Sequence, residues 1–127
     1  MAISPELNLS HADAFSQNGL ELLAGDDPVS AAAAFRAAIA ADPTHIEAHH
    51  GLIRALRDAG QFEAAVDAAR VLTTLTPEDP LALTSLSIAL QKAGQIPEAE
   101  TAAGRARILE WKQQLAEPVT SGEDSRG

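Results

Sequence analysis

The chain has 127 residues, enough for one domain with a modest core, and its formal net charge is −9. Hydrophobic residues make up 46% of the sequence but aromatic residues only 3%, so small side chains such as alanine supply much of the apolar surface. The acidic balance argues against electrostatically driven nucleic-acid binding, and the absence of cysteine excludes disulfides and thiolate chemistry.

The N-terminal third predicts one pair of helices. Residues 1–9 lack helical periodicity and contain a proline, which predicts an extended lead-in before the folded domain. Ser10 followed by Asp13 fits a capping box, so a first helix is expected from about 11 to 24. A Gly-Asp-Asp-Pro turn follows, and Pro28 suits the first position of a second helix that ends near Ala41.

Two further pairs are expected in the rest of the chain. Thr44 and Glu47 form a second capping box, which opens a helix that ends before Gly60; its partner covers about 62–75. Asp79 and Pro80 open a fifth helix that ends at Gly94. The sixth helix starts near Pro97 and, with no strong breaker before Pro118, extends to about Ala116 as a cap on the stack. Residues 118–127 are polar and are expected to form a disordered tail.

The three predicted pairs repeat at a spacing of 34 residues, which is the period of a helix–turn–helix repeat. Equivalent positions carry matching residues: Ala14, Ala48 and Ala82; Leu22, Leu56 and Leu90; Ala31, Ala65 and Ala99; Pro43 and Pro77. The strings GQFEAA and GQIPEA, which begin at Gly60 and Gly94, keep the same offset.

This pattern resembles the tetratricopeptide repeat (TPR) family. The family's signature has a large residue, Leu-Gly and a Tyr-like residue in the first helix, then Ala, a large residue and Ala in the second helix, then Pro. The first repeat matches it with Phe15, Gly19, Leu22, Ala31, Phe35, Ala38 and Pro43. In the second and third repeats His49, Ile53 and Ser87 depart from it. The resemblance implies an all-α, right-handed superhelical solenoid of three antiparallel helix pairs, with repeats at about 12–45, 46–79 and 80–113 within a domain of 10–117.

The resemblance also implies a concave groove, lined by the first helix of each pair, that binds a peptide or helix from another protein. Groove positions mapped onto this sequence include Asp13, Ser16 and Glu47, and the residues expected to carry binding are Leu20, Leu23, His50, Arg54, Arg57, Leu81, Ile88 and Lys92. The apolar members would provide burial and the basic ones would select an acidic partner. Alternatively, Arg54 and Arg57 are solvated residues paired with Glu47 or Asp58 at helical spacing.

One TPR subtype binds the acidic C-terminal tails of heat-shock chaperones through Lys and Asn side chains. The corresponding positions here hold Ser16, Leu20, Gly51, Arg54, Leu81 and Ser85, so only Arg54 could bind an anion. The sequence therefore does not favour that subtype.

His45 and His49 are the weak candidates for a metal site, because imidazoles four residues apart on a helix can chelate a transition metal. The alternative is that His49 packs in its repeat and His45 is a loop residue. No phosphate loop, catalytic serine motif or zinc-protease motif is present, so we expect neither an enzyme nor a cofactor.

Trp111 is the only tryptophan, and it falls in the extension of the last helix with Ile108 and Leu115. These residues would either cover the open end of the stack or form an end interface with a partner or a second copy. The sequence as a whole predicts a cytoplasmic, non-catalytic adaptor or assembly subunit that binds another protein. The alternative is a structural subunit that docks through its ends or its convex face.

Overall fold

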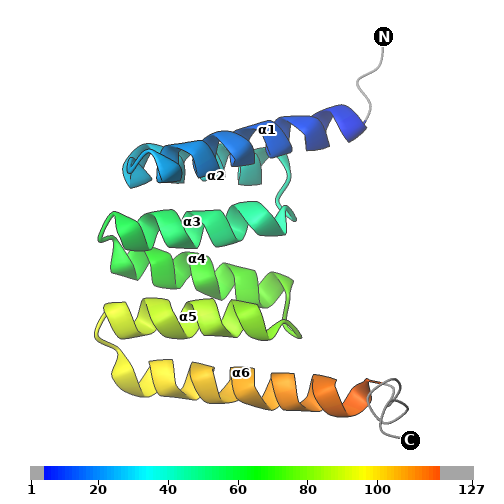
Figure 1. The fold of residues 1–127 in the computed structure, drawn as a ribbon, viewed down its shortest axis with the longest axis vertical. Helices are drawn as coiled ribbons and strands as arrows, with labels where there is room; N and C mark the ends of the chain where they lie inside the picture. Colours follow the sequence, from blue (N-terminus) through cyan, green and yellow to red (C-terminus); the bar gives the residue numbers. More distant parts are fainter. Residues whose placement is uncertain (1–4, 118–127) are drawn as a thin grey trace, which may run out of the picture.

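The computed structural model describes residues 5–117, with side chains from residue 11 onwards, and this part of the chain is built from six helices. They stack in chain order from one end of an elongated molecule to the other (Figure 1). Their bounds are α1 Pro5–Ala24, α2 Pro28–Ala41, α3 Ile46–Asp58, α4 Phe62–Leu75, α5 Pro80–Lys92 and α6 Ile96–Ala116. None of these helices is long and apolar enough to cross a membrane.

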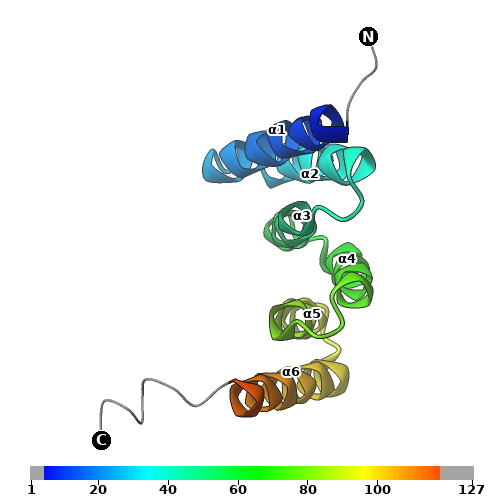
Figure 2. The ribbon, with the colours of Figure 1, turned by 90° about the vertical axis from the view of Figure 1, so that its right-hand side faces the viewer.

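The helices form two layers, with α1, α3 and α5 in one and α2, α4 and α6 in the other (Figure 2). Each helix packs on its neighbours in sequence, and α3 also contacts α1 and α5 directly. Within the described residues, the second helices of successive pairs make no such contact with one another. The first-helix layer is therefore the inner side of the stack, and the second-helix layer is the outer side. This arrangement confirms the predicted all-α solenoid of antiparallel helix pairs.

The turn inside each pair has the same backbone geometry. Asp26, Gly60 and Gly94, spaced by the repeat period, adopt positive φ values of 63°, 77° and 83°. In all three turns the following residue donates its N–H to the carbonyl five residues earlier, as in Gln61 to Leu56 at 2.8 Å. This is the Schellman ending, which satisfies the last carbonyls of a helix and reverses the chain.

Two expectations about helix starts are wrong. Helix α1 begins at Pro5, not near residue 11, so residues 5–9 are helical and Ser10 lies inside the helix. Proline is compatible with a first helical position because the N–H it lacks would have no partner there. The N-cap of α3 is His45, not Thr44. The predicted end of α6 at Ala116 is confirmed, while residues 1–4 of the lead-in and the predicted tail at 118–127 lie outside the described residues.

The core is made largely of alanine and leucine, with Phe35 as its one large aromatic member among the described residues. The Phe35 ring is fully buried and lies against Gly19 of α1 and Gly51 of α3. A Cβ atom at Gly19 would lie 2.7 Å from that ring, and one at Gly51 would lie 2.3 Å from it. The two glycines therefore provide the space that lets one ring join α1, α2 and α3.

The last pair ends the stack with charged residues. Ala32 and Val66 are buried in the first two pairs, and the equivalent residue of the third pair is the exposed Glu100. Arg107 is likewise the exposed counterpart of Ile39 and Thr73. A polar outer face is what a terminal repeat needs, because no further pair covers it.

Candidate functional site

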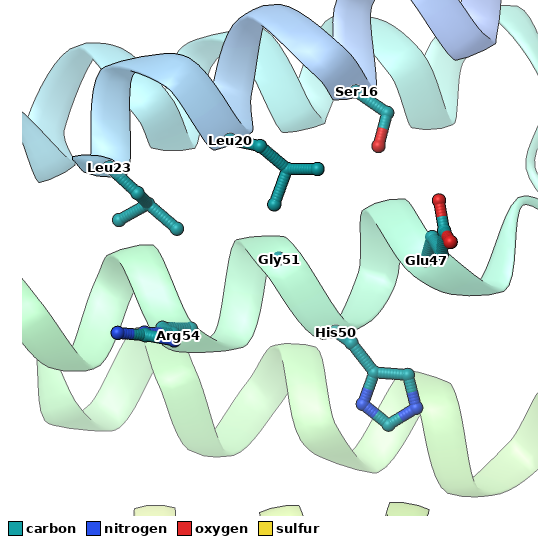
Figure 3. A pocket seen from close by; sticks show the side chains of 7 residues that line it. All are labelled: Ser16, Leu20, Leu23, Glu47, His50, Gly51 and Arg54. Carbon is teal, nitrogen blue, oxygen red and sulfur yellow. The ribbon is translucent and has the colours of Figure 1, made fainter. Parts of the chain in front are cut away.

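A hollow of about 300 Å³ opens between α1 and α3 on the inner, first-helix side of the stack. We call it the inner hollow. Its lining comes from both helices: Ser16, Leu20, Leu23, Glu47, His50, Gly51 and Arg54 (Figure 3).

The apolar part of the inner hollow is contributed by two leucines and a glycine. Leu20 and Leu23 point from α1 towards α3, where Gly51 offers no side chain to fill the space (Figure 3). Leu20 is 47% exposed although α1 packs on both α2 and α3. A Cβ atom at Gly51 would meet the Phe35 ring, so core packing excludes a side chain at this position of the lining.

Polar groups border the apolar part. The Ser16 hydroxyl is buried and has no hydrogen-bond partner among the described residues, and Glu47 points from α3 towards α1 (Figure 3). Arg54 lies farther along α3, with its Nε 3.7 Å from Oδ2 of Asp58. A carboxylate thus stands towards the start of α3 and a guanidinium towards its end. The polar border of the inner hollow is therefore asymmetric along α3.

The structure brings together four of the eight residues expected to carry binding. Leu20, Leu23, His50 and Arg54 line the inner hollow, although the His50 ring points away from α1 (Figure 3). The other four lie outside it: Arg57 has a buried Nε without a partner among the described residues, Leu81 and Lys92 are exposed on α5, and Ile88 is half-buried there. Their role in binding stays a prediction. Gly51, which the sequence placed only at a position of the chaperone-tail subtype, also lines the hollow.

Asp13 of α1 and His45, the N-cap of α3, form a tie, that is, a side-chain hydrogen bond that joins the two helices. His45 Nδ1 accepts the Ala48 N–H at 3.1 Å, so its proton is on Nε2, which donates to Oδ1 of Asp13 at 2.7 Å. His45 is therefore a helix cap and not simply a loop residue.

The two histidines proposed as weak metal candidates are each engaged elsewhere. Both ring nitrogens of His45 are used in the tie just described, and Nε2 of the buried His49 donates to the Pro43 carbonyl at 2.7 Å. Among residues 11–117, no group of three or more metal-binding side chains comes together. As arranged, the pair cannot chelate an ion without breaking these hydrogen bonds.

Trp111, Ile108 and Leu115 are 61%, 53% and 67% exposed on α6. Their spacing of three and four residues places them on one face of the helix. They therefore form an exposed apolar surface on the last helix, next to a terminal pair that carries the exposed Glu100 and Arg107 at its outer-face positions.

Comparison with known proteins shows which fold and repeat these elements form. The tetratricopeptide repeat family model matches residues 22–83. No curated protein resembles the sequence closely enough to count as a relative. Among solved structures, one of the MamA protein superposes with a TM-score of 0.78 at 23% identity, covering 91% of this chain and 63% of that one. This chain thus spans less than two thirds of the MamA chain.

Two other solved structures are similar over most of their length. The second TPR of Spaghetti (RPAP3), bound to an HSP90 peptide, has a TM-score of 0.75 at 18% identity, with 84% of this chain and 99% of that chain covered. The type III secretion translocator chaperone SycD of Yersinia enterocolitica has a TM-score of 0.73 at 17% identity, with 83% of each chain covered.

These structural similarities support the fold alone. The family match at residues 22–83, with the three helix pairs in register, shows that this chain is built from tetratricopeptide repeats.

Proposed function

We propose that this protein is a non-catalytic interaction module, an adaptor or assembly subunit that binds a segment of another protein in the inner hollow. The observation that carries the proposal is a preformed apolar depression with Leu20 exposed at its wall and Gly51 at its floor. Concave sites of this kind, apolar with a few placed polar groups, are where proteins bind ligands.

The chemistry of the lining suggests what part of a partner would fit. An apolar side chain of the partner would lie between Leu20 and Leu23, and a polar group beside it would satisfy the Ser16 hydroxyl. An acidic residue near Arg54 would compete with Asp58 for the guanidinium. Structures with this fold include a TPR bound to an HSP90 peptide and a CopN–Scc3 complex, which supports a protein partner.

The test compares two substitutions of an exposed apolar residue by aspartate in the full chain. Leu20→Asp places a charge in the wall of the inner hollow, whereas Val71→Asp places one on the outer side of α4, where the native residue is 51% exposed. Each variant is used as bait in quantitative affinity capture from the native host, after circular dichroism has shown unchanged helicity. Leu20→Asp should lower recovery of the specific partners at least about tenfold, since burial of a leucine contributes about 1.5–3 kcal/mol.

Val71→Asp should retain those partners. If both variants retain the same proteins to the same extent, the inner hollow is not the binding site. Arg54→Glu provides a second test, which should weaken binding less than Leu20→Asp because the arginine is exposed and already paired.

A further inference from the structure

The outer side of the stack carries a second cleft, which is separate from the inner hollow. It has a volume of about 360 Å³ and lies between α6 and the turn that joins α4 to α5. Pro77, Leu83 and Leu109 give it apolar walls, and Arg105, Ile108 and Lys112 of α6 stand along its edge. We call it the outer cleft.

Helices α4 and α6 make no direct contact, and between them Leu83 of α5, itself largely buried, lines the outer cleft. Helix α6 continues past the repeat, and the side-chain amide of Gln113 donates to the carbonyl of Glu78, fixing the extension against the α4–α5 turn. Arg105 also lines a smaller hollow of about 180 Å³ farther along α6, so the depression continues along the helix.

An apolar stripe borders this cleft. Ile108 lines the cleft and, with Trp111 and Leu115, forms one exposed face of α6. Tryptophan is among the residues most enriched where interfaces concentrate their binding energy. The stripe and the cleft together make a larger apolar surface than either one alone.

The charge around this surface has the opposite sign to that of the chain. Two of the residues that line the outer cleft, Arg105 and Lys112, are basic in a protein of net charge −9. No carboxylate among the side chains of residues 11–117 forms an ion pair with either of them. Glu78, at the far edge of the cleft, is the one acidic residue in its lining.

We propose that the outer cleft and the stripe dock an acidic amphipathic helix of a partner protein. One apolar side chain of that helix enters the cleft beside Ile108, others pack on Trp111 and Leu115, and its carboxylates pair with Arg105 and Lys112. The site is separate from the inner hollow, so a partner on each side would make the protein a bridge.

The observations favour this occupant over two others. A two-fold pairing of copies would bring the same patch of both copies together, and the lining of that patch offers one carboxylate, Glu78, against two basic residues, Arg105 and Lys112. An anionic membrane would be repelled by the rest of the chain, whose net charge is −9.

Trp111, the only tryptophan, supplies the measurement. The full chain is titrated with a synthetic peptide that lacks tryptophan, carries leucines at helical spacing and is flanked by glutamates; a matched peptide has lysine in place of glutamate. The acidic peptide should change Trp111 emission saturably and the basic peptide should not. Lys112→Glu should weaken binding several-fold and Ile108→Ala about tenfold.

Matched variants separate these effects from general ones. Arg36→Glu and Val29→Ala change an exposed arginine and an exposed apolar residue of α2, and should leave affinity unchanged. Leu20→Asp should also leave it unchanged, which separates this site from the inner hollow. Equal binding of the two peptides, or equal effects of Lys112→Glu and Arg36→Glu, would overturn the proposal.

The rival occupants give results of their own that would also overturn it. A concentration-dependent mass in light scattering, abolished by Ile108→Ala in the absence of peptide, would assign the surface to a second copy. Stronger binding to phosphatidylglycerol vesicles than to phosphatidylcholine vesicles, lost in Lys112→Glu, would assign it to a membrane.

Discussion

At two positions that face each other within each repeat, a larger residue on one helix is paired with a smaller residue on the other. The first repeat places Phe35 in α2 opposite Gly19 in α1. At the same positions, the second repeat has Ala69 and Ile53, and the third has Ala103 and Ser87. A ring on one helix is thus combined with a glycine on the other, and a methyl group with a larger side chain. In the third repeat, the Ser87 hydroxyl donates to the Ala99 carbonyl of α6 at 2.8 Å.

This packing predicts that Gly51→Ala destabilises the protein, although alanine is the better helix former. The new methyl group would meet the Phe35 ring at 2.3 Å, and the ring is fully buried, so it has no free space to enter. Overpacking of this kind costs about 1–3 kcal/mol. Thermal and urea unfolding monitored by circular dichroism measure the free energy of unfolding.

Gly104→Ala is the matched control, because a methyl group there would meet only Arg107 at an ordinary 3.8 Å. It should stabilise the protein by about 0.5–1 kcal/mol. Combining Gly51→Ala with Phe35→Leu should cost less than the sum of the single changes, since the two residues share one space. Additive costs would show that the ring does not limit position 51.

At the scale of helices and turns, the helix boundaries could be predicted mainly from the residue types that lie between the helices. Proline after aspartate and glycine at the repeat spacing predicted every turn, because glycine accepts a positive φ and proline, which lacks an N–H, fits a first helical turn but not a helix interior. The start of α1 was missed because Pro5 is compatible with either a lead-in or a first helical turn. His45 was missed as a cap because histidine is not among the usual capping residues, and its role depends on Asp13, 32 positions away.

The three turns predict that Asp26→Gly stabilises the protein. Asp26 holds the left-handed position that glycine holds in the two later turns. An L side chain is strained there, while glycine adds entropy to the unfolded chain, so the expected net gain is about 0.5 kcal/mol, or a rise of a few degrees in Tm. Differential scanning calorimetry measures the Tm.

Gly60→Asp is the reverse change at the equivalent position of the second repeat. It should lower the Tm, and because a Cβ there meets no atom within 4 Å, the effect would come from backbone strain alone. A lower Tm for Asp26→Gly would mean that the Asp26 side chain stabilises its turn in a way that outweighs the strain.

At the scale of the whole molecule, the inner hollow was only half predictable. The resemblance to the TPR family implied which face of each first helix lies inward, and Leu20, Leu23 and Arg54 were found in that way. Which inward faces enclose a common space depends on how successive pairs rotate against one another. That rotation is set by contacts such as the one between Phe35 and Gly51, and no single repeat contains both residues. The outer cleft likewise arises from the separation of α4 and α6, which the period alone does not specify.

The stack also predicts a gradient of local stability along the molecule. Helix α3 contacts four other helices and buries seven of its 13 residues, whereas α6 contacts only α5 among the described helices and buries three of its 21. In a linear array, stability is a sum of repeat and neighbour terms, so a helix with one neighbour opens more often. Amide hydrogen exchange should therefore be slowest in α3 and fastest in residues 110–116.

Gln113 allows this gradient to be tested at one contact. Its side-chain amide binds the Glu78 carbonyl, while the adjacent Gln114 makes no side-chain hydrogen bond with any described residue. Gln113→Ala should speed exchange in residues 110–116 by up to about tenfold and leave α3 unchanged, because one hydrogen bond contributes about 0.5–1.5 kcal/mol. Gln114→Ala should change neither. If exchange in residues 110–116 of the unsubstituted protein is as slow as in α3, the extension is held by more than this one contact and its own helix.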